Sequence, residues 1–301
     1  MMRFGLTTPV VTLNPKASAP WEREAGPAEL RRIAEAADRL GYHHLTCSEH
    51  VGIPTGVVAE RGGRYYDPLA TFGFIAGFTE RIRLATHVLV LPYHHPLEIA
   101  KRYGTLDRIS GGRLILGVGV GSLEEEFRLL DAEFEKRGPL YEDALAALRA
   151  AFGRIEPSYA GSHYRFEGFV IDPCGVQERV PIWVGGRSAR SLRRALEWSD
   201  GWDPFRLNLE ELRTLLAQAR SWPSWRAREE RGERFEIVLT PERAFDVSTD
   251  EGREQMRTLA RGYAEIGATV LTLRFRSRSL ESFLEQIEIF AERIAPDLAR
   301  A

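Results

Sequence analysis

The chain has 301 residues, of which 44% are hydrophobic, so it can bury a large core. Its 41 Lys and Arg residues nearly balance its 43 Asp and Glu residues, and the net charge of -2 is spread along the chain, which excludes the basic footprint of a nucleic-acid-binding protein. Two cysteines, Cys47 and Cys174, argue against a disulfide framework, and no stretch approaches the ~20 apolar residues of a membrane span, so we expect a cytoplasmic protein without a membrane partner.

The predicted elements alternate between apolar strands and amphipathic helices along the whole chain. Strands are expected at residues 3–8, 42–50, 82–91, 113–121, 181–184, 201–204, 235–240 and 269–275. Helices are expected at residues 28–40, 68–79, 96–108, 123–130, 139–153, 189–199, 209–222, 252–266 and 280–294. The joints ADRLGYHHLTC and YAEIGATVLTL repeat one pattern, a helix that ends at glycine and then an apolar strand. Repetition of such units predicts a (β/α)8 TIM barrel of the α/β class, in one domain over residues 1–301, with an open doubly wound sheet as the alternative.

Two segments depart from this alternation. The stretch GIPTGVVAERGGRYYD after the second strand is too long for a simple connector, so we interpret it as a lid or a substrate-pocket loop. Residues 155–180 contain GSHYRFEGFVID, whose short alternating runs predict a hairpin inserted near the fifth strand. The stretch between residues 222 and 235 is rich in Arg and Glu and is expected to be a polar connector.

The second strand, YHHLTCSEH, ends in Glu49 and His50. In a barrel of this class, the chemistry takes place where the strands give way to the loops that follow them. Imidazole exchanges protons near neutral pH, and a neighbouring carboxylate can hold it in one tautomer. Glu49 and His50 are therefore the candidate catalytic pair, and the alternative is that His50 is a hydrogen-bonded histidine with a structural role.

The fourth strand ends in the glycine run GVGVG, which includes Gly119 and Gly121. Its spacing differs from that of a dinucleotide-binding turn, and no ribose-binding acid follows at the expected distance. Glycines at a strand end permit close approach of a neighbouring strand or of a flat ligand. Ser122 is expected to cap the helix that follows, because three glutamates occupy the first turn of that helix.

The fifth strand runs into VGGRSAR, in which Gly185 and Gly186 precede Arg187 and Ser188 at the start of a helix. Backbone N–H groups, a helix N-terminus and a guanidinium together form a good phosphate-binding site. We therefore predict a phosphate cradle here, and an ordinary tight turn between strand and helix is the alternative.

Six of the seven histidines lie between residues 43 and 95, but they do not predict a metal site. The pairs His43–His44 and His94–His95 are expected to point to opposite faces of extended segments. A metal-dependent hydrolase would need clustered ligands at several strand ends, and only Glu49, His50 and Asp203 are available.

Five segments in order resemble the luciferase-like flavin and deazaflavin oxidoreductases. They are SEH, RLATHVLVLPYHHPLEIAK, LDRISGGRLILGVGVGSLEEEF, YAGSHYRFEGF, and PIWVGGRS followed by SDGWDP. The similarity extends from residue 4 to about residue 204 and, more loosely, to the last helix. It implies a (β/α)8 barrel with an insertion near strand five, which binds FMN or the deazaflavin coenzyme F420 at the carboxyl ends of the strands.

The resemblance also implies roles for individual residues. Glu49 and His50 match the acid–histidine pair of the deazaflavin branch, although aspartate is commoner at the first position. The family usually has a bulge with a cis non-prolyl peptide behind the ring, which by position is His87–Val88, next to Thr86.

Gly185 and Gly186, with the turn that follows, match the site for the cofactor phosphate. Sugar-phosphate dehydrogenases of the family have a catalytic glutamate where this chain has Ser122, which argues against oxidation of glucose 6-phosphate. The family often forms homodimers, and we expect one here by analogy.

We therefore predict an F420-dependent oxidoreductase that transfers hydride to or from a small organic substrate. The first alternative is a monooxygenase that uses reduced FMN, and the second is a flavin-binding barrel without catalytic activity. The preference for F420 rests mainly on Glu49 and His50.

Overall fold

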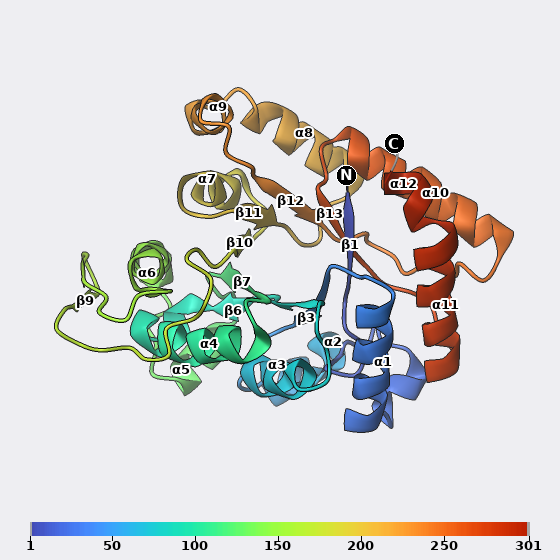
Figure 1. The fold of residues 1–301 in the computed structure, drawn as a ribbon, viewed down its shortest axis with the longest axis horizontal. Coiled ribbons are helices and arrows are strands. Elements are labelled where there is room, and N and C mark those ends of the chain that lie inside the picture. Colours follow the sequence, from blue (N-terminus) through green and yellow to red (C-terminus); the bar gives the residue numbers. More distant parts are fainter. Residues whose placement is uncertain (1, 300–301) are drawn as a thin grey trace.

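A closed barrel of eight parallel strands forms the centre of the computed structural model, which describes residues 2–299 (Figure 1). Neighbouring strands pair in chain order, and the ring closes because the last strand pairs with the first over four residues. The strands are β1 (Arg3–Leu6), β3 (His44–Cys47), β5 (Arg83–Thr86), β7 (Leu114–Gly119), β10 (Ile182–Gly185), β11 (Gly201–Asp203), β12 (Glu236–Leu239) and β13 (Val270–Leu273). The predicted TIM barrel is confirmed.

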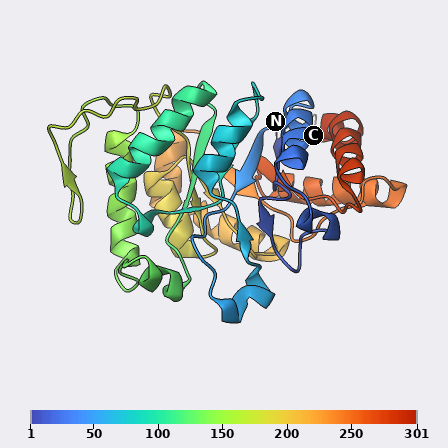
Figure 2. The same cartoon turned by 90° about the horizontal axis from the view of Figure 1, so that it is seen from below.

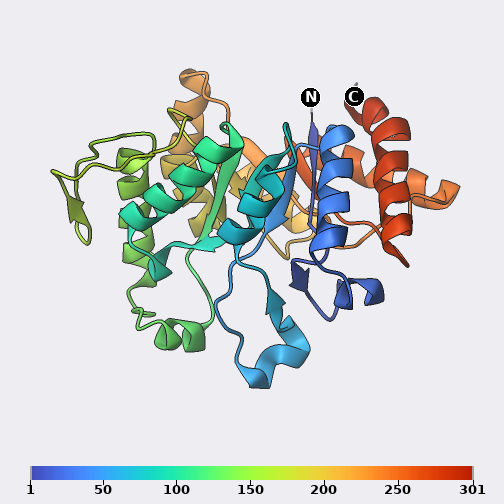
Figure 3. The ribbon, with the colours of Figure 1, turned by 60° about the horizontal axis from the view of Figure 1, so that its bottom comes forward.

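Helices cover the outside of the barrel (Figures 1 and 3). The principal helices are α1 (Pro27–Arg39), α3 (Pro68–Ala76), α4 (Pro96–Ser110), α6 (Arg137–Ala151), α7 (Ala189–Trp198), α8 (Leu209–Ala219), α10 (Asp250–Glu265) and α11 (Leu280–Arg293). Shorter helical segments are η1 (Pro20–Arg23), η2 (Thr55–Val57), α2 (Val58–Arg61), η3 (Leu91–Tyr93), α5 (Glu124–Leu129), α9 (Pro223–Glu230) and α12 (Ala295–Ala299). No helix of the described chain is both long and apolar enough to cross a membrane.

The apolar side chains of the barrel strands fall into two clusters because successive side chains of a strand point to opposite sides of the barrel wall. On β10, Ile182 and Val184 belong to the large cluster between the strands and the helices. Trp183, between them, points inward and packs in a separate small cluster with residues such as Val238 and Val270. The barrel is therefore filled by side chains rather than open along its axis.

The strand predicted at residues 82–91 is wrong as a continuous element. It forms β5 and then β6 (Leu89–Val90), and His87 and Val88 lie between them. The backbone leaves the ladder there so that the side chain of Val88 packs over β7, where a Cβ on Gly119 would lie 2.6 Å from Val88 Cγ2.

The predicted polar connector after α8 is also wrong, because residues 223–230 form α9. Pro223 starts this helix, which suits its fixed φ angle. The side chain of Arg228 is buried and donates hydrogen bonds to the carbonyl oxygens of Leu196 and Ser199, both at 2.6 Å. Tertiary contacts thus stabilise a helix whose sequence looks like a polar linker.

The helix predicted at residues 123–130 begins one residue later, as α5. Leu123, and not Ser122, is its N-cap residue. The capping prediction for Ser122 is therefore wrong, and the serine instead lines the cavity described below.

The two predicted insertions have structure of their own. The long loop after β3 contains η2, α2 and β4 (Arg64–Tyr65), which pairs antiparallel with β2 (Thr12–Leu13). The segment near strand five contains the predicted hairpin, β8 (Tyr159–Ala160) with β9 (Arg165–Phe166). The hairpin extends away from the barrel, whereas the loop with α2 projects below it (Figures 2 and 3).

Candidate active site

A cavity of about 690 Å³ opens at the carboxyl ends of the strands, a volume typical of small-molecule sites. Of the twelve predicted site residues, eleven line it: Glu49, His50, His87, Val88, Gly119, Gly121, Ser122, Gly185, Gly186, Arg187 and Ser188. Thr86 does not line it. The side chain of Thr86 is buried, and its hydroxyl donates to the carbonyl oxygen of Gly117 at 2.7 Å.

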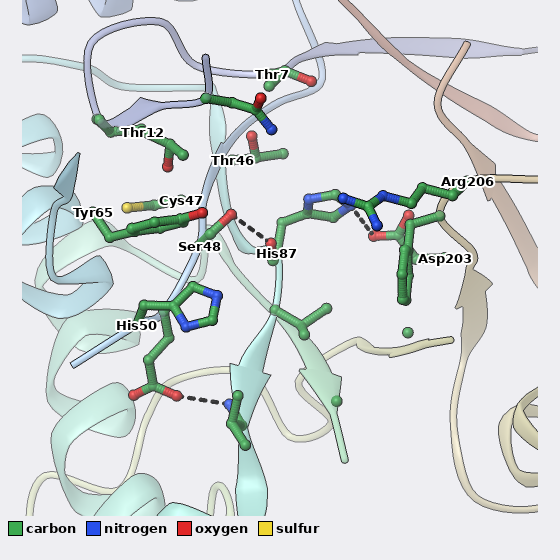
Figure 4. A pocket seen from close by; sticks show the side chains of 18 of the residues that line it. Thr7, Thr12, Thr46, Cys47, Ser48, His50, Tyr65, His87, Asp203 and Arg206 are labelled. Carbon is green, nitrogen blue, oxygen red and sulfur yellow. Dashed lines mark hydrogen bonds and ion pairs between the residues drawn. The ribbon is translucent and has the colours of Figure 1, made fainter. Parts of the chain in front are cut away.

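His50 lies on one wall of the cavity against the edge of Tyr65 (Figure 4). Its Nδ1 is 2.8 Å from Oε2 of Glu126, a residue of α5 that is fully buried. Burial by itself would raise the pKa of Glu126, but the hydrogen bond and charge of His50 lower it below its usual value. Glu126 is therefore ionised and accepts the Nδ1 proton, which leaves Nε2 as the nitrogen that can exchange a proton with a ligand.

Glu126 also fixes the chain that follows His50. Its Oε1 accepts the backbone N–H of Val51 at 2.5 Å, and its Oε2 accepts the hydroxyl of Tyr93 at 3.0 Å. The pKa of Tyr93 is raised, first by burial and then by the charge of Glu126. One carboxylate thus orders the histidine, the start of the loop and a neighbouring tyrosine.

The expected contact between Glu49 and His50 is wrong. Glu49 turns away: its Oε1 is 2.7 Å from Nε2 of His94, and its Oε2 accepts the backbone N–H of Val90 at 2.7 Å. Ser48 adds a hydrogen bond from its hydroxyl to the carbonyl oxygen of His87 at 2.7 Å. Glu49 therefore holds the segment from β6 to His94, just after η3, in place.

Sequence reasoning missed Glu126, although a signal was present. Glu126 stands next to the apolar Phe127 on the buried face of α5, whereas Glu125 is exposed. An acid on the buried face of an amphipathic helix requires a partner, so this position pointed to a functional carboxylate.

The floor of the cavity is formed by Val88. The His87–Val88 peptide is cis, which confirms that prediction. The side chain of Val88 lies over two glycines, because a Cβ on Gly119 would be 2.6 Å from its Cγ2 and a Cβ on Gly185 would be 3.1 Å from its Cγ1. The glycines therefore permit close packing of Val88, which presents an apolar surface to the cavity.

The opposite wall is polar. His87, Asp203 and Arg206 lie together there (Figure 4), with Nε2 of His87 at 3.2 Å from Oδ2 of Asp203. Asp203 Oδ1 and Arg274 Nε are buried at this cavity without a hydrogen-bond partner among residues 2–299. Such orphaned groups are available to a ligand.

The structure predicts how His87 responds to loss of its partner. Burial lowers the pKa of His87, but the charge and hydrogen bond of Asp203 outweigh burial, so the net pKa is raised above 6.5. In Asp203→Asn, burial acts unopposed, and we expect the pKa of His87 to fall below 6.5 in an NMR titration. A pKa that stayed above 6.5 would contradict the pairing.

The same shift has a stability consequence. Because the folded-state pKa of His87 is raised, its stabilisation of the fold is fully present below the unfolded-state value of 6.5 and is lost as pH rises through the folded value. The difference in unfolding free energy between the native protein and Asp203→Asn should therefore shrink between pH 6 and pH 9.

The predicted phosphate cradle lies at the N-terminus of α7. Gly186 has a φ of 116°, a value that disfavours other residues. Ser188 is the N-cap residue, with its hydroxyl accepting the backbone N–H of Ser191 at 3.3 Å. The hydroxyl of Ser188 accepts within the helix but keeps its own O–H to donate, and the exposed side chain of Arg187 adds a charged group for a phosphate.

A family model described as luciferase-like monooxygenase matches residues 2–297. An F420-dependent glucose-6-phosphate dehydrogenase from Nakamurella multipartita is 30% identical over 203 residues, which cover 65% of this chain and 56% of that protein.

Solved structures show the same fold. The monooxygenase RslO1 from Streptomyces bottropensis has a TM-score of 0.78 at 21% identity, covering 98% of this chain and 99% of its own. The oxygenating constituent of 3,6-diketocamphane monooxygenase from Pseudomonas putida, in complex with FMN, has a TM-score of 0.71 at 15% identity, and the match covers 98% of this chain and 99% of that chain.

Proposed function

The chain belongs to the luciferase-like monooxygenase family of oxidoreductases, and we propose that it transfers hydride between coenzyme F420 and a small organic substrate. The observation that carries the proposal is the arrangement of His50. Its Nδ1 is held by the buried carboxylate of Glu126, and Nε2 is left to face the cavity. An imidazole fixed in this way can give or take the proton that must accompany hydride transfer.

The lining of the cavity fits a flat cofactor with a phosphate. Val88 offers an apolar floor for one ring face, because Gly119 and Gly185 leave room for it. Arg187 and the N-terminus of α7 would hold the phosphate. When bound, a deazaflavin supplies hydride transfer and reacts little with oxygen.

Two residues of the chain would act on the substrate, one by exchanging a proton and one by orienting it. His50 would accept a hydroxyl proton at Nε2 when an alcohol is oxidised, and would return it when a carbonyl is reduced. Arg274, whose Nε has no hydrogen-bond partner in the described part of the chain, would orient the substrate oxygen.

The polarity of the cavity supports hydride transfer over oxygenation. Five arginines line it: Arg61, Arg187, Arg194, Arg206 and Arg274. Monooxygenation with reduced FMN requires a closed, dry pocket, whereas hydride transfer does not. Arg187 and Arg206 among them are exposed, and a lining with five guanidinium groups is therefore better suited to the deazaflavin reaction.

Replacement of Gly119 tests the floor of the proposed cofactor site. A Cβ at this position would lie 2.6 Å from Cγ2 of Val88, so Gly119→Ala must displace that side chain. Overpacking costs about 1–3 kcal/mol, and we expect cofactor affinity to fall about tenfold or more. Gly73→Ala is the control, since a Cβ at Gly73 meets nothing within 4 Å. Equal cofactor affinity in both variants would show that Val88 does not contact the cofactor.

The proposal is tested by titrating the protein with F420 and, separately, with FMN, followed by an oxygen-consumption assay. Tight binding of F420 without oxygen uptake supports it. Binding of reduced FMN with substrate-dependent oxygen uptake would establish the monooxygenase alternative. Binding of FMN or F420 without turnover of any alcohol or carbonyl compound would favour a flavin-binding barrel without catalytic activity.

A further inference from the structure

A second cavity of about 200 Å³ lies at the opposite end of the barrel from the candidate active site. Its lining comes from the amino-terminal ends of the strands: Arg3 begins β1, Arg83 begins β5 and Glu236 begins β12. Trp183, the second residue of β10, forms its inner side. Because this face is remote from the cavity that holds His50, a ligand here would be separate from the proposed reaction.

Three buried N–H donors at this cavity have no acceptor among residues 2–299. They are Nε of Arg3, Nε of Arg83 and Nε1 of Trp183, a side chain that is only 2% exposed. Buried donors are rarely left unpaired in folded proteins. Three of them on three different strands around one small cavity therefore point to a ligand that accepts several hydrogen bonds.

The charge at the cavity is positive. Four arginines line it, against the two carboxylates of Asp200 and Glu236. Both carboxylates are already engaged, Glu236 by Arg3 and Arg234, and Asp200 by Arg149 and Arg179.

Arg83 is the lining arginine that forms no direct ion pair with any of residues 2–299. Its Nη2 donates only to Oε1 of Gln177 at 3.0 Å and to the carbonyl oxygen of Leu114 at 3.2 Å. Burial lowers the pKa of Arg83 and the charge of Arg3 lowers it further, and the more distant carboxylates of Asp107 and Glu236 offset this only in part. Water could satisfy the donors but would leave this charge uncompensated.

The protonation of His43 is also governed by the positive charge at this cavity. Nε2 of His43 accepts a hydrogen bond from Arg3 Nη1 at 3.0 Å, so Nδ1 carries the proton and donates to Nδ1 of His44 at 3.0 Å. Burial and the nearby arginines lower the pKa of His43 to about 3. The expectation that His43 and His44 point to opposite faces is wrong, and both rings are neutral parts of one hydrogen-bonded chain below the cavity.

We propose that this cavity binds a small tetrahedral oxyanion of the phosphate class. The oxygens of such an anion accept the three unpaired N–H groups at once, and its charge balances Arg83. Arg179 and Arg234, which are largely exposed, stand at the rim and attract the anion. Ligation at the ends of several barrel strands stabilises the fold, because the anion binds only the folded chain.

The test is a calorimetric titration with inorganic phosphate at constant ionic strength, with the melting temperature measured in parallel. The α7 cradle is a second place for phosphate, so two variants separate the sites. Arg83→Gln should weaken the proposed binding about tenfold or more and abolish most of the thermal shift. Arg187→Gln, which alters only the α7 cradle, should keep the binding event and the part of the thermal shift that Arg83→Gln removes.

Trp183→Phe provides a second test in case Arg83→Gln does not fold, because it removes the indole N–H and keeps an aromatic ring. It should also weaken binding by several-fold. Phosphate binding that is lost in Arg187→Gln but intact in Arg83→Gln and Trp183→Phe would overturn the proposal, as would no saturable binding at all. A parallel titration with glycerol phosphate separates the sources: equal binding indicates the phosphate group of a metabolite, and exclusion indicates the free anion.

Discussion

Replacing His50 with alanine is expected to lower turnover by about 100-fold or more, while cofactor affinity stays within about tenfold of the native value. The imidazole lies on the wall of the cavity and is fixed by Glu126, so its loss removes the proton donor and acceptor but no part of the floor under the ring. Circular dichroism checks the fold, a fluorescence titration checks cofactor affinity, and steady-state assays give kcat and KM.

The control for this variant is His163→Ala. His163 is exposed and lies on the hairpin between β8 and β9, away from the cavity lining. The His163→Ala variant should retain full turnover. Turnover in His50→Ala equal to that of the control would remove His50 from the mechanism.

Glu126→Gln is expected to lower turnover by at least about tenfold. The amide is nearly isosteric with the carboxylate, but its NH2 group is a donor, so it cannot accept all the hydrogen bonds from His50, Val51 and Tyr93. His50 then loses the partner that sets its tautomer. The effect should fall on kcat rather than on KM, because Glu126 does not line the cavity.

Two comparisons separate positioning from structure. Glu125→Gln alters an exposed residue of the same helix and should leave kcat unchanged. Glu126→Asp keeps the charge and should recover part of the lost turnover. If turnover falls in Glu126→Gln and does not recover at all in Glu126→Asp, the packing of α5 is responsible, and not the negative charge that Glu126 places beside His50.

The charge of Glu126 also predicts a pH dependence of stability. Its folded-state pKa is lowered below 4.5, so its stabilisation is present above the unfolded-state value and is lost as pH falls through the folded value. The unfolding free energy of the native protein should therefore approach that of Glu126→Gln below pH 4.5, and exceed it at pH 7. A constant difference across this range would contradict the ionised state of Glu126.

The architecture and the location of the site followed from the order of residues along the chain. Alternating apolar strands and amphipathic helices determine a parallel barrel, and the parallel pairing gathers every strand's carboxyl end on one face. This order alone therefore predicts that Glu49, His50, Gly119 and Gly185 share one cavity, and all four line it. The resemblance of five segments to one family added the cis peptide at His87–Val88, which local patterns do not reveal.

The partners of the site residues were decided by the tertiary structure alone. His50 bonds Glu126, 76 residues away, and not its neighbour Glu49, because adjacent residues at a strand end point in different directions. The contact between His87 and Asp203 joins the residue after β5 to the last residue of β11. The periodicity of a sequence specifies which face a side chain occupies, but which side chain it meets depends on the rotation of helices and the path of loops. The role of Glu126, like the arginine-lined cavity at the opposite face, therefore became visible only in the folded chain.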